Sequence, residues 1–324
     1  MTKTPVGRAY LQIHFCVLLW GFTAILGKLI TLPALPLVWT RMLIVVVALA
    51  LLPRVWRSLR AMPARLLWSY AGIGVLVALH WLTFCGAIKL ANASVAATCI
   101  ALATVFTALV EPWLAKSRFS RRDLALGIAV LPGVALVAGG VPPEMRIGIA
   151  VGALSALFVA MFGSLNKRLV TEGDPLTVTA LELGAGTLAL TLLAPMMPWV
   201  FPAFAGELLV MPSTRDIVLL LVLSLGCTLL PFALSLVALR HMSAFAAQLA
   251  VNLEPVYAIV LAILLLGEQH ELSGRFYIGV AVILAAVFVH PLLGKRGVMA
   301  HPEVLATAES KAAIGGGDGA ERET

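Results

Sequence analysis

The stretch SAFAAQLAVNLEPVYAIVLAILLLGE, residues 243–268, decides the fold. It is almost entirely apolar over more than the roughly 20 residues that an α-helix needs to cross a bilayer. Near its middle, Glu254 and Pro255 place a carboxylate beside a helix breaker, where a membrane helix ordinarily has neither. We therefore predict a transmembrane helix with an irregularity at mid-membrane, and ask whether Glu111-Pro112 in another apolar run is a second copy of it.

The composition extends this prediction to the whole chain. Of 324 residues, 61% are hydrophobic and 12% are charged, whereas soluble domains carry about 25% charged residues. Such an excess of apolar residues indicates a polytopic membrane protein in a lipid bilayer. The net charge of +7 comes from short basic loops between apolar runs, so we expect no nucleic-acid partner. The four cysteines lie in apolar runs without metal-ligand spacing, and we expect neither a metal nor a cofactor.

Ten apolar segments are long enough to span a membrane, so the predicted fold class is an all-α integral membrane protein with ten transmembrane helices. The segments are 10–30, 35–52, 66–88, 93–114, 123–140, 147–169, 176–198, 215–238, 243–266 and 273–293. Residues 294–324 contain GGGDG and scattered charges, which predicts a disordered cytoplasmic tail. Lysine and arginine gather in alternate loops, and the positive-inside rule therefore places both termini in the cytoplasm of a multi-pass protein of the cell (inner or cytoplasmic) membrane.

An internal repeat relates the two halves of the chain. Residues 87–93 (AIKLANA) align without gaps with residues 238–244 (ALRHMSA), so Glu254 falls opposite Ala103 and Glu111 is not its copy. The repeats are residues 1–140 and 147–293, with five helices each. Because five is odd, the second repeat must be inserted upside down, an arrangement common in secondary transporters.

Several motifs, in this order, resemble the EamA family of the drug/metabolite transporter superfamily. They are Trp20-Gly21-Phe22 with Lys28, Arg41 early in the second helix, residues 253–258 (LEPVYA) followed by Leu266-Gly267-Glu268, and Gly279 in the last helix. The resemblance covers about residues 10–293. It implies a basket-like bundle whose central cavity is lined mainly by helices 1, 3, 4, 6, 8 and 9, and export or exchange of small metabolites by alternating access. It does not name a substrate.

The sequence also departs from the family pattern. The first repeat has Lys116-Ser117 where the pattern has Gly-Glu, and it carries an additional Glu111. The second repeat lacks an arginine that matches Arg41 and has Glu182 nearby instead.

Glu254 is the first candidate for a substrate or proton pathway, because a charge at mid-membrane costs about 2.5–3.5 kcal/mol on insertion scales. Gln248 and Asn252 share one helix face, Pro255 lies on nearly the same face, and Glu254 lies to its side. This polar group is typical of a cavity lining. The alternative is that it braces a kink through an ion pair or a hydrogen bond.

The other candidates for that pathway are His80, Trp81, Trp20 and Glu182. A histidine can relay protons near neutral pH, and the tryptophans can stack on a substrate ring, although both residue types also occur as packing residues. Three charges are interpreted as structural or interfacial. We expect Arg41 near the outer surface, where it can snorkel, Glu111 near a helix end where it can pair with Lys116 or Arg118, and Lys89 at the end of the third apolar run.

The leading hypothesis is a secondary transporter that exports a small metabolite, an amino acid or a similar amphiphile, by alternating access. One alternative is a lipid or metabolite flippase or exchanger of the same fold. Another is an integral-membrane enzyme, which is disfavoured because the chain has no H-E-x-x-H or G-x-S-x-G motif. The expected partners are a small-molecule substrate and the bilayer, and a homodimer is allowed.

Overall fold

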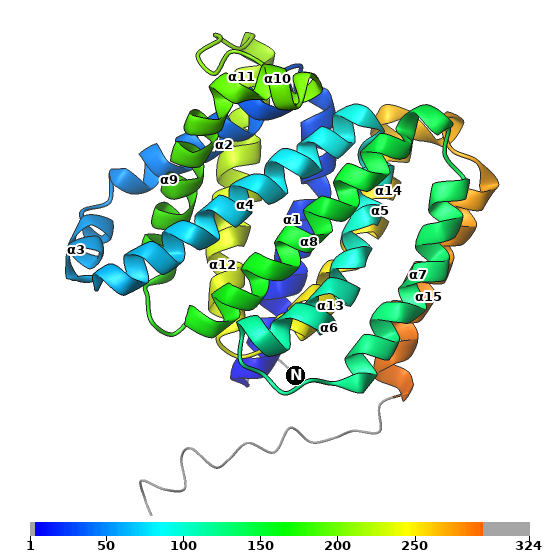
Figure 1. Cartoon of the computed structure of the whole chain (residues 1–324), viewed down its shortest axis with the longest axis horizontal. Helices are drawn as coiled ribbons and strands as arrows, with labels where there is room; N and C mark the ends of the chain where they lie inside the picture. The colour runs from blue at the N-terminus through cyan, green and yellow to red at the C-terminus, as the bar shows by residue number, and fades with distance from the viewer. Residues whose placement is uncertain (1–3, 294–324) are drawn as a thin grey trace, which may run out of the picture. The chain divides into compact units, whose positions relative to one another are not determined.

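The computed structural model describes residues 4–293, which form helices and no β-strand (Figure 1). The tail predicted from Gly294 onward lies outside these residues. The unbroken long helices are α1 (Pro5–Leu29), α2 (Ala34–Ala50), α4 (Ala64–Leu90), α7 (Arg121–Gly139), α8 (Arg146–Leu169), α9 (Pro175–Leu193) and α15 (Gly274–Leu293). Two short helices, α3 (Pro53–Ala61) and α10 (Met197–Val200), follow α2 and α9. The predicted all-helical class is confirmed.

Three further spans change their hydrogen-bonding pattern partway along. A 3₁₀ turn (Ile100–Leu102) joins α5 (Ala93–Cys99) to α6 (Ala103–Leu114), and a π-helical segment (Val222–Leu229) joins α11 (Thr214–Leu221) to α12 (Leu230–Leu239). The opening stretch of sequence divides into α13 (Ala244–Val251) and α14 (Glu254–Leu266). Within the described range, eight helices or joined helices are long and apolar enough to span a membrane, and nine if α2 and α3, bent by 91°, count as one span. α15 is also apolar over Gly274–Ala286.

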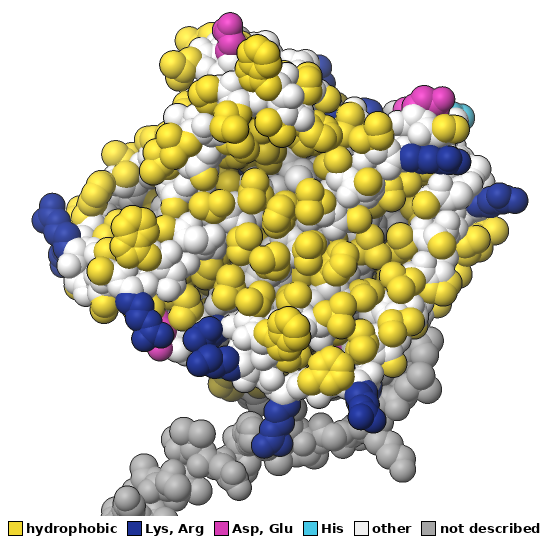
Figure 2. All heavy atoms as spheres, in the orientation of Figure 1, with side chains coloured by type: hydrophobic (Ala, Val, Ile, Leu, Met, Phe, Trp, Pro, Cys, Tyr) yellow, Lys and Arg dark blue, Asp and Glu magenta, His cyan; other side chains and the backbone are white. Residues whose placement is uncertain are grey.

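The surface suits a lipid environment. Figure 2 shows hydrophobic side chains across the middle of one face and lysine and arginine side chains at its margins. Many large apolar residues of the spans are exposed, among them Leu188, Leu192 and Leu264. In a bilayer these side chains meet hydrocarbon, so their exposure costs nothing there.

Glycines allow the closest helix contacts. A Cβ atom at Gly74 of α4 would overlap the backbone carbonyl of Glu182 on α9, and one at Gly186 would lie 2.7 Å from the carbonyl oxygen of Gly74. A Cβ at Gly21 of α1 would lie 2.7 Å from the Cβ of Tyr257 on α14. Small residues at such crossings bring helix backbones together, which supplies packing energy where no hydrophobic effect operates.

Two glutamates join α5–α6 to α13–α14 at opposite ends. Glu268, just after α14, is buried and accepts hydrogen bonds from the backbone amides of Ala93 and Ser94, both at 3.0 Å, and from the Ser94 hydroxyl at 2.6 Å. Glu111, near the end of α6, accepts from the amides of Ala244 and Phe245 at 3.2 and 2.9 Å. Each carboxylate therefore satisfies the free amides at the first turn of the other repeat's broken helix.

This arrangement corrects the predicted partner of Glu111. The sequence placed it near a helix end, where it lies, and paired it with Lys116 or Arg118. Instead Glu111 is buried against the start of α13. Glu111 caps a broken helix of the second repeat as Glu268 caps one of the first. The residue of the first repeat that aligns with Glu268 is nevertheless Ser117. Both repeats have the same left-handed turn at this point, since Lys116 has φ 55° and the aligned Gly267 has φ 70°. This conformation costs a non-glycine residue roughly 1–2 kcal/mol.

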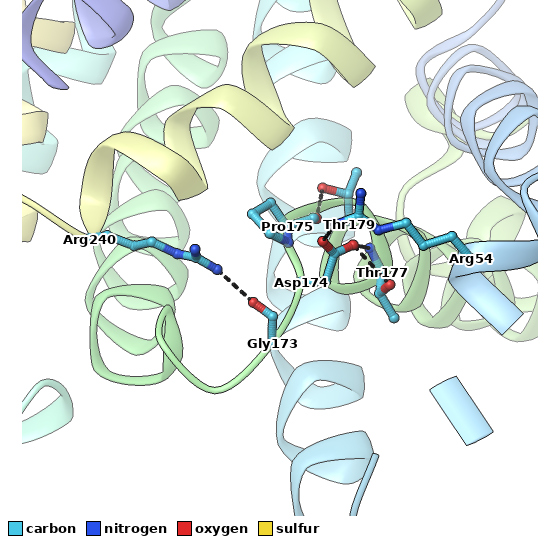
Figure 3. A network of polar contacts seen from close by, with 7 residues as sticks. All are labelled: Arg54, Gly173, Asp174, Pro175, Thr177, Thr179 and Arg240. Atoms are coloured by element: carbon cyan, nitrogen blue, oxygen red, sulfur yellow. Dashed lines mark hydrogen bonds and ion pairs between the residues drawn. The ribbon is translucent and has the colours of Figure 1, made fainter. Parts of the chain in front are cut away.

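Basic residues at aligned positions of the two repeats close other helix ends. Lys89 donates to the carbonyl of Ile30, which caps α1, at 2.5 Å. Its aligned counterpart Arg240 donates to the carbonyls of Val170, which caps α8, at 3.1 Å and of Gly173 at 2.8 Å. Figure 3 shows the second contact and, on the same loop, the ion pair between Asp174 and Arg54 of α3. Lys89 is thus a structural residue in its contacts.

We predict that Glu268→Gln and Glu111→Gln each lower the free energy of unfolding by about 1–3 kcal/mol, because an amide offers a donor to a backbone donor and leaves a buried N–H unsatisfied. Thermal unfolding of the purified protein in detergent measures this effect. Glu144→Gln is the matched control, since Glu144 is exposed. Equal unfolding temperatures for all three variants would show that the carboxylates do not hold the helix ends.

The glycine contacts give a second matched pair on one helix. Gly74→Ala forces α4 away from α9 and should cost about 1–3 kcal/mol, as overpacking does. Gly72→Ala, two residues away with nothing within 4 Å of its added Cβ, should be neutral or stabilising, because alanine favours a helix by about 1 kcal/mol. Thermal unfolding of the two variants in detergent measures both effects. A loss of stability with Gly72→Ala equal to that with Gly74→Ala would contradict the packing argument.

Candidate functional site

A cavity lies among helices of both repeats. Its volume is about 110 Å³. Its lining comes from α1, α4, the α5–α6 span, α8, α12 and the α13–α14 span, with Arg41 added from α2. One end lies near Asn166, Leu239 and Ala244, where α8 and α12 end and α13 begins. We call this side the N face, because α1 begins there.

Contacts at the other side close the bundle, and we call this side the opposite face. The backbone amide and the hydroxyl of Thr31, just after α1, donate to the two carboxylate oxygens of Asp216 in α11 at 3.1 and 2.5 Å. The ring of Phe204 fills the space where a Cβ at Gly86 of α4 would lie. The contact of Lys89 with Ile30 is at the same end.

Arg41 is deep in the bundle, which corrects the predicted position near the outer surface. Its side chain is 1% exposed. Its guanidinium lies 4.0 Å from the ring centre of Trp81, and Nε donates to the hydroxyl of Thr228 at 2.5 Å. Nη1 has no hydrogen-bond partner. The apolar pattern indicates how far Arg41 lies from the end of its helix but not which side of α2 faces the bundle, so the snorkelling interpretation was wrong.

The π-helical segment supplies the partner of Arg41. The Thr228 hydroxyl donates to the carbonyl of Leu223, five residues earlier, at 2.6 Å, as π-helical spacing allows. This fixes the hydroxyl so that its oxygen accepts from Arg41. π-Helical turns are rare and occur frequently at functional sites.

Glu254 lies at the first turn of α14, where the span restarts. Residues 252–253 form a turn between α13 and α14, and Pro255, which has no N–H, occupies a first-turn position that tolerates it. Glu254 is 7% exposed and lines the cavity. Within residues 4–293 its carboxylate makes neither a hydrogen bond nor an ion pair, although Arg41 lines the same cavity.

The turn also divides the predicted polar group. Gln248 and Glu254 line the cavity, but Asn252 and Pro255 do not. Asn252 is buried and donates to the hydroxyl of Thr104 on α6 at 2.6 Å. The expectation that all four line one cavity was therefore wrong for two of them, because Asn252 bonds to Thr104 instead and Pro255 follows the turn.

His80 and several aromatic residues form an apolar part of the cavity lining. Nδ1 of His80 lies 3.0 Å from the carbonyl oxygen of Ser155 and 2.8 Å from its hydroxyl, which itself donates to the His80 carbonyl. A carbonyl only accepts, so Nδ1 carries the proton and Nε2 is the acceptor of the neutral ring. The aromatic wall comprises Trp20, Trp81, Phe84, Phe162 and Phe232.

Glu182 lies outside the cavity lining. It is 0% exposed, and one carboxylate oxygen accepts from Asn166 at 3.3 Å while the other has no partner. Asn166 does line the cavity. Glu182 is therefore separated from the cavity by one side chain, and it makes no contact with Arg41.

Sequence reasoning missed several polar lining residues. Thr23, Ser164, Asn166 and Ser235 all line the cavity. Asn166 precedes Lys167 at the end of an apolar run, where a polar residue draws no attention. Four lining residues have a buried polar atom without a partner: Thr23 Oγ1, Arg41 Nη1, Asn166 Oδ1 and Gln248 Nε2. Unpaired buried groups are rare in folded proteins, so their concentration here indicates a site for a polar ligand.

The lining supplies groups that can bind a small molecule. In the described part of the chain, no group of three histidine, cysteine, aspartate or glutamate side chains is placed to hold a metal ion. The lining instead offers a fixed cation, a carboxylate, amide and hydroxyl groups, and aromatic rings. Such a mixture of apolar surface with a few directed polar groups is typical of small-molecule sites.

Comparison with known proteins gives the family. The model of the EamA-like transporter family matches residues 7–139 and again residues 146–290. No curated protein is significantly similar in sequence. A solved structure described only as the crystal structure of a protein matches with a TM-score of 0.61 and 20% identity, covering 89% of this chain and 98% of that chain. That likeness shows the fold alone.

The two family matches together span nearly all of the described residues, and the apolar helices agree with a multi-pass membrane protein. The resemblance carried by Trp20-Gly21-Phe22 and by residues 253–258 is thus confirmed. The chain belongs to the EamA-like transporter family of the drug/metabolite transporter superfamily.

Proposed function

We propose that the protein is a secondary transporter that exports a small metabolite, an amino acid or a similar amphiphile, across the cytoplasmic membrane. The observation that carries the proposal is the cavity between the repeats, where Arg41 and Glu254 are buried without an ion pair. A buried charge without a partner is costly. Two such charges in one cavity support a role for both groups in binding a molecule there.

The proposed architecture has ten spans in two inverted repeats, residues 1–140 and 147–293. The eight long apolar spans, the bent α2–α3 pair and α15 together supply ten. Inversion is supported by the aligned contacts of Lys89 and Arg240, which close the ends of α1 and α8. It is also supported by Glu111 and Glu268, which hold opposite ends of the same pair of broken helices.

Transport proceeds by alternating access in this proposal. The cavity reaches toward the N face, whereas the Thr31–Asp216 and Lys89–Ile30 contacts close the opposite face. With both termini in the cytoplasm, this state receives cargo from inside the cell. Opening the opposite face requires those contacts to break and the cavity to close near Asn166 and Ala244.

Glu254 and His80 are the proposed substrate or proton groups inside the cavity, and Glu182 is a proton group behind it. Trp20, Trp81 and Gln248 bind cargo. Asn252 and Pro255 act indirectly, since the Asn252–Thr104 contact and the break at Pro255 fix where α14 restarts.

We predict that Glu254→Gln lowers the rate of solute efflux from loaded proteoliposomes at least about tenfold, because a hydrogen bond to a charged group is worth about 1.5–3 kcal/mol. His80→Ala should also slow efflux through loss of the cavity wall. The measurement loads a metabolite library and follows release by mass spectrometry. Glu144→Gln, on the exposed loop after α7, is the control and should match the unmodified protein. Release equal to that of empty vesicles for every solute would disprove the transporter.

The orientation has a separate test. Single cysteines replacing the exposed Ser117 and Glu144 lie at the N face and the opposite face, and the four native cysteines are buried. With cytoplasmic termini, an impermeant maleimide should label Glu144→Cys in intact cells and Ser117→Cys only after permeabilisation. The reverse pattern would contradict the proposed topology, and the unmodified chain controls for native cysteines.

A further inference from the structure

The charges that line the cavity carry a conclusion about the cargo. Of the described side chains in the lining, Arg41 is the one lysine or arginine and Glu254 is the one aspartate or glutamate. They share one cavity yet are not within ion-pair distance. Two opposite charges that face one space without meeting are arranged for a molecule that has a complementary charge for each.

Arg41 is held so that it can bind a carboxylate. The ring centre of Trp81 lies 4.0 Å from the guanidinium, and Nε donates to the Thr228 hydroxyl at 2.5 Å. These two contacts fix the plane of the guanidinium. Nη1 remains buried and without a partner. A fixed guanidinium with free N–H groups matches the two oxygens of a carboxylate, and it needs little reorganisation when the carboxylate arrives.

Glu254 offers the opposite charge. Its carboxylate is buried at the cavity wall and has no donor within hydrogen-bond reach among the described residues. An ammonium group supplies up to three donors to such an acceptor. The amide of Gln248 and the hydroxyl of Thr23 line the same space, and each has an unpaired atom for further hydrogen bonds.

The rest of the wall is apolar. The rings of Trp20, Trp81, Phe84, Phe162 and Phe232 face the cavity. They suit an apolar or aromatic side group and leave no further charged lining residue for a second anionic or cationic group. A purely anionic or purely cationic cargo would leave one of the two charged residues buried without a partner.

We propose, resting on the transporter function above, that the cargo is a small zwitterion with an apolar or aromatic side group. Arg41 binds its carboxylate and Glu254 binds its ammonium group. The aromatic wall holds the side group.

Three probes with one aromatic body test the proposal: L-phenylalanine, phenethylamine and 3-phenylpropionate. Binding to the purified full-length protein is measured by thermal stabilisation and by tryptophan fluorescence. L-leucine, isoamylamine and 4-methylpentanoate repeat the comparison with an aliphatic body. In at least one set, the zwitterion should bind at least about tenfold tighter than the amine and the acid of that set. Each of these two lacks one charge-assisted hydrogen bond, and the loss is worth about that factor.

Substitutions of Arg41 and Glu254 test which charged group of the cargo each residue binds. Arg41→Gln should reduce affinity for the zwitterion to that for the amine, and Glu254→Gln should reduce it to that for the acid. Glu144→Gln, an exposed acid outside the lining, should leave the order unchanged. Should Arg41→Gln not yield folded protein, Arg41→Lys, which keeps the charge and loses the planar fork, must weaken binding of the zwitterion and the acid but not of the amine.

Equal affinities within both sets, or Arg41 and Glu254 variants that weaken all three probes alike, would overturn the proposal. The binding assay does not depend on transport. If some other solute is exported while neither set shows a preference for the zwitterion, the assigned cargo class is wrong and the transporter function stands. If the zwitterion binds as expected and no solute crosses the membrane, the transporter function fails instead.

Discussion

The bundle depends on satisfying every backbone hydrogen-bonding group away from water. A bilayer offers no partner to a free N–H or C=O, yet three spans change their hydrogen-bonding pattern partway along and several helices end among neighbours. Side chains from other helices meet this requirement: Glu268 and Glu111 close the first turns of α5 and α13, and Lys89 and Arg240 close the last carbonyls of α1 and α8. Each of these contacts joins segments far apart in the sequence, so the pairing of backbone groups and the assembly of the bundle are one process.

The same requirement explains where the cavity is. Where α13 gives way to α14, the turn at residues 252–253 turns Asn252 toward Thr104 and leaves Glu254 at the cavity wall. The π-helical segment brings the Thr228 hydroxyl to Arg41. Irregular backbone is tolerated inside a membrane protein where it lines a polar space. The two irregular segments therefore hold the two opposite charges of the site.

Much of the fold follows from the sequence because it rests on composition and period. The apolar runs predict the helices, and the motif order predicts the family. The site was predicted less well, for three physical reasons. The depth of Arg41 in the membrane says nothing about which side of α2 packs inward. The helix does continue from Gln248 to Asn252, whose amide donates to the Gln248 carbonyl at 3.2 Å, but the period does not show that the Asn252 side chain bonds to Thr104 and stays outside the cavity lining. The partners of Glu111, the amides of Ala244 and Phe245, lie 133 and 134 residues further along the chain, and no local pattern contains those contacts.

For the zwitterionic cargo proposed above, the charges in the cavity also bear on how the membrane potential acts on transport. Moving one elementary charge across 100 mV is worth about 2.3 kcal/mol. Arg41 and Glu254 stay in the protein, and a cargo whose own charges cancel carries none across, so its movement does no electrical work. Voltage then acts only on a proton that travels with it. A cell could release such a cargo down its concentration gradient at any membrane potential, and it would draw on the potential only when a proton takes part in the cycle.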